Sequence, residues 1–160
     1  MIPSTLRRFR LRAETLDETR AFLLERGAKG LEAVVLWLGR IVDDETAEIA
    51  SAYVPEQIAR RGEDGVSVEV TQDGLARLIA ALPPELFVLV RVHSHPSEAY
   101  HSELDDLNML ISHQHAISIV VPNFAIEPIN LAACSVNELE HGRGWRELAL
   151  DEVAERFEVR

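Results

Sequence analysis

The stretch LFVLVRVHSHPSEAYHSELDD, residues 86–106, decides how this sequence is interpreted. Residues 86–93 are mostly apolar and rich in valine, which predicts a central strand of a sheet. His95 precedes a proline, and this favours extended backbone at the histidine itself. The loop 96–101 then leads to Ser102, the expected N-cap of a helix with an apolar face. The stretch therefore predicts a strand, a loop and a helix in succession.

Two histidines and an aspartate in this stretch have the spacing of metal ligands. Positions i and i+2 of a strand point to one face, so His93 and His95 can aim two imidazoles at one point. Ser102 and Asp105 are three residues apart and share one side of the first helical turn. Two imidazoles and a carboxylate form the ligand set of a catalytic zinc that keeps its fourth position for water. Asp106 offers a substitute ligand, but the serine spacing favours Asp105.

Each of these signals also has an interpretation that needs no metal. Paired histidines at the end of a strand are often incidental. The pair Ser102 and Asp105 also reads as an N-cap followed by an acidic third residue. Both interpretations of Asp105 can hold together, because a cap fixes the first turn and with it the direction of the carboxylate.

Outward from this stretch, hairpins alternate with helices along the chain. A capping box of Thr15 and Glu18 predicts the first helix. Gly39 to Glu45 is expected to form a turn, and 56–65 a charged loop. We expect strands at 6–13, 31–38, 46–54, 66–70, 86–93, 117–121, 130–139 and 145–149, and further helices after Thr71, with Leu75, Leu78, Ile79 and Leu82 on one face, and after Asp151. This order predicts a single α/β domain over 1–160, with a mixed, mainly antiparallel sheet flanked by helices.

Composition narrows the classes of partner. The 160 residues carry a formal net charge of −11, which argues against a nucleic-acid partner because phosphates would be repelled. The charge is compatible with a partner that presents a basic patch or tail. Cys134 is the single cysteine, so no internal disulfide can form, and its apolar surroundings predict a buried, inert thiol. No membrane span or signal peptide is visible, so we expect a cytoplasmic protein with no membrane partner.

The pattern His-x-His-Pro, five residues, then Ser-x-x-Asp resembles the signature of the JAMM (MPN) metalloprotease family. That family also carries a glutamate in an early apolar strand. Glu32 matches it within LEAVVLWLG, residues 31–39, except that Val35 stands where a glycine is common. Taken alone, Glu32 also fits a carboxylate at the edge of a strand that faces solvent. The resemblance extends over most of the chain and implies a single MPN domain.

The resemblance also implies roles for the residues of the site. His93, His95 and Asp105 would bind one Zn²⁺. Glu32 would act as general base, and Ser102 would donate a hydrogen bond to the oxyanion. Tyr100 and His101, which adjoin the site, are the expected contacts with substrate.

The family's activity implies a zinc isopeptidase that cleaves after the C-terminal glycine of a ubiquitin-like protein. Stretches such as AYHSE at 99–103 and SIVVPNF at 118–124 resemble prokaryotic members from anti-phage operons, including the CBASS and Bil systems. Operon-encoded activating and conjugating enzymes are then expected partners, beside the ubiquitin-like protein or its conjugate. Two alternatives stand beside this hypothesis: a zinc peptidase that processes a sulfur-carrier protein, and a scaffold of the same fold without catalysis.

Overall fold

The computed structural model describes residues 1–102 and 111–160. Its strands are β1 (Arg8–Leu11), β2 (Val34–Ile41), β3 (Thr46–Tyr53), β4 (Gln57–Gly62), β5 (Gly65–Val70), β6 (Phe87–Ser94), β7 (Ile117–Val121), β8 (Ser135–Glu140), β9 (Gly144–Glu147) and β10 (Phe157–Val159). Its helices are α1 (Ala13–Gly27), α2 (Gln72–Ala81) and α4 (Leu150–Arg156), with short 3₁₀ turns η1 (Asn123–Ala125) and η2 (Leu131–Ala133). The helix expected to begin at Ser102 falls on 103–110 and lies outside the described residues.

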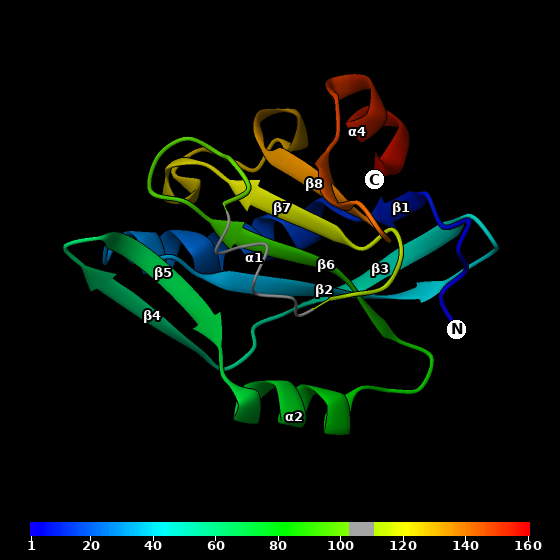
Figure 1. The fold of residues 1–160 in the computed structure, drawn as a ribbon, viewed down its shortest axis with the longest axis horizontal. Coiled ribbons are helices and arrows are strands. Elements are labelled where there is room, and N and C mark those ends of the chain that lie inside the picture. The colour runs from blue at the N-terminus through cyan, green and yellow to red at the C-terminus, as the bar shows by residue number, and fades with distance from the viewer. Residues whose placement is uncertain (103–110) are drawn as a thin grey trace.

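Eight strands form one sheet in the order β10-β1-β3-β2-β6-β7-β8-β9. The pairs β2–β3, β2–β6, β7–β8 and β8–β9 are antiparallel, whereas β1–β10, β1–β3 and β6–β7 are parallel. The strands β4 and β5 form a separate hairpin, which stands away from the large sheet on the left of Figure 1. This arrangement confirms the predicted α/β class with a mixed, mainly antiparallel sheet.

Helices cover both faces of the sheet, as Figure 1 shows. The larger core lies between the sheet and α1, where Val35, Trp37, Val90 and Val92 are buried. A smaller core forms on the opposite face of β2, beneath α2 and the hairpin: Val34, Leu36, Leu38, Val68 and Leu78. The apolar residues of β2 therefore alternate between two cores, which explains why almost the whole strand is apolar.

The first helix begins earlier than the sequence indicates. Arg12 is the N-cap and makes no side-chain cap, so the prediction that Thr15 and Glu18 form a capping box is wrong. Thr15 is buried inside the helix, where its carbonyl oxygen accepts a 2.7 Å hydrogen bond from Thr19 Oγ1. The hydroxyl oxygen of Thr19 in turn accepts from Trp37 Nε1 at 2.9 Å, which ties α1 to β2.

The sequence predicts a turn that starts at Gly39. In the structure Gly39 lies within β2 instead. The register of the pairing between β2 and β3 shifts between Leu38 and Gly39, which marks a bulge. A Cβ atom at Gly39 would lie 2.5 Å from the carbonyl oxygen of Glu48 on the neighbouring strand. The glycine is therefore required by the close approach of two backbones, and β2 continues to Ile41.

The segment 56–65, expected to be a charged loop, contains strand β4 and the turn into β5. Its charges are accommodated because a two-stranded hairpin can expose both faces, and Arg60 forms a 3.0 Å ion pair with Glu69 across it. The helix that follows is capped as predicted, since Thr71 Oγ1 accepts from the backbone N–H of Gly74 at 2.9 Å. Ile79, expected on the buried face of α2, is 66% exposed.

The predicted C-terminal hairpin is present with other bounds, since β8 ends at Glu140 and β9 is Gly144–Glu147 in place of 145–149. Residues 131–133 form η2, and β8 begins only at Ser135, so Cys134 lies before the strand and not within it. Helix α4 follows Ala149, whose backbone N–H donates to Glu152 at 2.8 Å, so Asp151 is not the cap. Among residues 1–102 and 111–160, no helix is both long and apolar enough to cross a membrane.

Candidate metal centre

The two histidines of the HxHP motif meet at the end of β6. This strand lies between β2 and β7, and His93 is in register with Val34 on one side and Val120 on the other. His95, just beyond the end of β6, is bonded to the sheet as well, because its backbone N–H donates to the carbonyl oxygen of Val121 at 2.9 Å. Both histidines are buried, and their Nε2 atoms are 3.2 Å apart. The prediction that they aim at one point is therefore consistent with the geometry.

This separation suits two ligands of one metal ion. Nitrogen ligands lie about 2.0–2.1 Å from a tetrahedral metal such as zinc, and two of them are then about 3.3 Å from each other. The backbone at His93 is also held in place, because β6 is hydrogen-bonded to a strand on each side. A site of this kind needs little reorganisation when a cation binds.

Glu32 lies beside this histidine pair. The next residue, Ala33, donates its backbone N–H to Ser94 Oγ at 3.1 Å and accepts from Ser94 N at 3.2 Å. Ser94 is the residue between the two histidines, so these bonds fasten the start of β2 to the motif. Glu32 is 9% exposed. The alternative of a strand-edge carboxylate facing solvent does not describe it.

The side chain of Gln57 completes the edge of β2 at this point. Strand β3 pairs with β2 only as far as Leu36 and Tyr53, which leaves Val34 without a neighbour from β3. Gln57 takes that place: its Oε1 accepts from Val34 N at 2.8 Å, and its Nε2 donates to Val34 O at 3.0 Å. The same Nε2 also donates to Pro55 O at 2.9 Å. The amide thus joins the first residue of the hairpin to the first residue of β2, two positions after Glu32.

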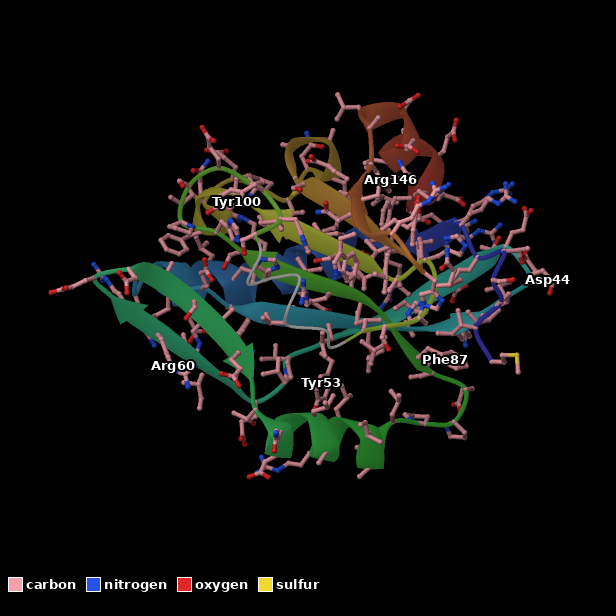
Figure 2. The ribbon with its side chains drawn as sticks, viewed as in Figure 1. Asp44, Tyr53, Arg60, Phe87, Tyr100 and Arg146 are labelled. Carbon is pink, nitrogen blue, oxygen red and sulfur yellow. The ribbon has the colours of Figure 1, made fainter. Side chains whose placement is uncertain are left out.

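The loop after β6 returns over the histidines. The ring of Tyr100 packs edge-on against that of His95, with centroids 4.7 Å apart, and Tyr100 remains 56% exposed. Figure 2 shows Tyr100 on this loop, on the same side of the molecule as the hairpin with Arg60. The ring of His101 lies 5.2 Å from that of Trp145. Ser102 follows directly and is half-buried.

The expected carboxylate ligand, Asp105, lies outside the described residues, as does its substitute Asp106. Within residues 1–102 and 111–160 no group of three histidine, cysteine or acidic side chains could hold a metal. The described part of the site therefore contains two candidate nitrogen ligands, His93 and His95, and the buried residue Glu32.

Two residues that sequence reasoning missed also contact this region. Arg91, buried on β6, contacts His101 and Ser118. Its signal was present, because an arginine in a strand of otherwise apolar residues needs polar partners when buried. Gln57 gave no signal, since it stood in a segment interpreted as a loop.

Two further titratable side chains are held away from the histidine pair. Cys134 is half-buried, which corrects the prediction of a buried thiol, but its surroundings still raise the pKa of the thiol to about 12 through burial. Burial also lowers the pKa of His113, whose Nε2 lies 3.1 Å from the carbonyl oxygen of Val88.

Two buried imidazoles whose ring nitrogens converge at the end of a central strand have the donor chemistry of a metal-dependent hydrolase. The chain is 35% identical over 136 residues to "Probable metalloprotease y4jG" of Sinorhizobium fredii. The aligned region covers 84% of this chain and 83% of that protein. The chain therefore belongs to the family of this metalloprotease.

The fold has a counterpart among solved structures. The solution structure of protein DSY2949 from Desulfitobacterium hafniense superposes with a TM-score of 0.60, covering 95% of this chain and 92% of the other. At 18% identity, this likeness concerns the fold alone. No protein-family model matches the chain.

Proposed function

We propose that this protein is a JAMM-type zinc peptidase that cleaves after the C-terminal glycine of a ubiquitin-like protein, either in deconjugation or in precursor processing. The observation that carries the proposal is the 3.2 Å separation of the His93 and His95 Nε2 atoms, with the buried residue Glu32 directly before Ala33, which is hydrogen-bonded to Ser94. The relationship to a metalloprotease supports the same chemistry. We further propose that it acts in the cytoplasm, in an anti-phage conjugation system.

In this proposal the side chains divide the work of peptide hydrolysis. His93 and His95 hold the metal, with Asp105 as the third ligand. Bound zinc would lower the pKa of a coordinated water and polarise the scissile carbonyl. Glu32 takes the proton from the attacking water and passes it to the departing amine nitrogen as the C–N bond breaks. Ser102 donates its hydroxyl hydrogen to the carbonyl oxygen as that oxygen gains negative charge.

The substrate's tail is proposed to lie extended between the hairpin and the loop 96–101. The strands β4 and β5 pair only with each other among the described elements, so an extended chain can add to the hairpin's edge. Glycines next to the scissile bond fit this arrangement, because the tail's backbone must approach the metal closely. Arg60 and Arg61, on the hairpin, are proposed to contact the folded body of the ubiquitin-like protein.

Metal content is the first test. Protein purified without chelator should contain one zinc per chain by elemental analysis, and His95→Ala should lose it. The fold should survive this loss, because the core does not depend on the metal. A zinc-free wild-type protein with full hydrolytic activity would overturn the proposal.

The second test is cleavage of a ubiquitin-like fusion bearing a C-terminal extension, followed by mass spectrometry. Cleavage should occur after the terminal glycine and should fail when the terminal glycines are changed to alanine. Glu32→Gln should abolish turnover while zinc stays bound. Glu25→Gln, at an exposed position of α1, is the matched control and should leave turnover unchanged.

The outcome also separates the alternatives. Cleavage restricted to a sulfur-carrier precursor would favour the processing enzyme. A protein that binds zinc but cleaves neither substrate would favour the non-catalytic scaffold.

A further inference from the structure

Arg91 places a positive charge in the interior of the sheet. It lies on β6 two residues before His93, and therefore on the same face of the strand. The residue is only 3% exposed. A buried guanidinium is costly unless its N–H groups are hydrogen-bonded, so the contacts of Arg91 identify what it holds in place.

Those contacts come from three separate segments. Arg91 Nη2 donates to Ser118 Oγ on β7 at 3.0 Å and lies 3.3 Å from His101 Nε2 on the loop. The guanidinium carbon lies 5.8 Å from the centroid of the Trp145 ring on β9. Because arginine has no acceptor, the Nε2 atom of His101 must accept, which places the hydrogen of the neutral ring on Nδ1.

His101 is thereby fixed on two sides. Its Nε2 atom accepts a hydrogen bond from Arg91, and the centroid of its ring lies 5.2 Å from that of Trp145. The residues on either side of it belong to the site: Tyr100 packs on His95, and Ser102 follows in the chain. A shift of His101 would therefore move both of its neighbours relative to the histidine pair.

We propose that Arg91 is a positioning residue, which holds residues 100–102 over the histidine pair through its contact with His101. The kinetic part of this inference rests on the proposed function, because Ser102 is there the donor to the oxyanion. Misplacement of a reacting group by about 1 Å can cost about 100-fold in rate. Arg91 is buried beneath the loop and does not itself face the proposed substrate groove, so KM should change less than kcat.

The kinetic experiment compares zinc-loaded Arg91→Met and Arg91→Lys with wild type on the ubiquitin-like fusion. Arg91→Met should lower kcat about 10- to 100-fold and leave KM within about threefold and zinc content at the wild-type level. Arg91→Lys should retain an intermediate kcat, because one ammonium cannot reproduce the planar fork of donors. Unchanged kcat in Arg91→Met would overturn the proposal.

Arg156 at the end of helix α4 is a matched control, because its guanidinium forms a 3.3 Å ion pair with Glu138 of β8, away from the elements that Arg91 joins. Arg156→Met should lose stability without the loss of kcat. If Arg91→Met fails to fold, His101→Phe removes the same hydrogen bond while keeping a ring against Trp145, and should show the same fall in kcat. Where both variants fold, their double mutant should be no worse than either alone. Additive losses would overturn the proposed coupling.

Hydrogen exchange provides a readout that needs no substrate. A peptide covering 97–102 should exchange faster in Arg91→Met than in wild type, and at the wild-type rate in Arg156→Met. Equal exchange in all three proteins would overturn the positioning role. If wild type cleaves no ubiquitin-like fusion but the exchange difference is found, the proposed function fails and the positioning role stands.

Discussion

Replacing Gln57 by alanine should destabilise the fold, because it removes the hydrogen bonds of one side-chain amide. Its side chain makes three hydrogen bonds, two to the backbone of Val34 at 2.8 and 3.0 Å and one to Pro55 O at 2.9 Å. A net contribution of about 1 kcal/mol for each gives a loss of about 3 kcal/mol. For a domain of this size that corresponds to a fall in Tm of about 9 °C.

The assay is thermal unfolding of three variants followed by circular dichroism. Gln57→Glu keeps the size and the acceptor but places a carboxylate against two carbonyl oxygens, so it should be at least as destabilised as Gln57→Ala at pH 7. Its deficit relative to wild type should shrink as the pH falls and the carboxyl group binds a proton. Gln72→Ala, at the exposed start of α2, is the control and should change stability by at most about 0.5 kcal/mol. A Gln57→Ala variant that melts within a degree of wild type would refute the reasoning.

Three further outcomes are expected. Because burial lowers the pKa of His113 from its ordinary 6.5, the unfolded chain binds the proton first, so stability should fall between pH 7 and pH 5. His113→Gln should flatten that decline in urea denaturation, and an identical slope would contradict this assignment. With its pKa raised to about 12, the Cys134 thiol should resist iodoacetamide at pH 8 in the native protein and react in urea; rapid native alkylation would show that it is accessible. Neutralising Arg60 and Arg61 should raise KM for the fusion, whereas an unchanged KM would leave this part of β4 as plain surface.

Strands whose own residues are consistently apolar could be predicted from the sequence. Segments whose conformation depends on contacts with distant residues could not. Residues 117–121 were predicted as a strand with their observed bounds, because five consecutive apolar or small residues ending at a proline leave little choice. Gly39 was misassigned because its role depends on the backbone of Glu48 on another strand. Residues 57–62 were misassigned because the charged side chains of β4, Arg60 and Arg61, are exposed and leave the backbone free to pair with β5.

In the candidate site, too, the features set by local sequence could be predicted and those set by distant contacts could not. The convergence of His93 and His95 follows from strand periodicity, which is local. That Glu32 lies beside them depends on bonds between residues 61 positions apart, and only the family resemblance indicated it. Gln57 gave no local signal, because its partners lie in another segment. Arg91 was visible as a charge in an apolar strand, but its partners on the loop and on β7 could not be predicted.

The parallel pairing of β1 with β10 has a consequence for the order of folding. This pairing joins positions as far apart as Arg10 and Glu158, whereas the strands around the histidine pair belong to residues 34–121. During synthesis the central strands can therefore associate while the last strand is still unmade, and the outer edge closes afterwards. Loop-closure entropy makes the more distant pairing the slower step. A nascent chain should thus acquire the geometry of its histidine pair before its sheet is complete.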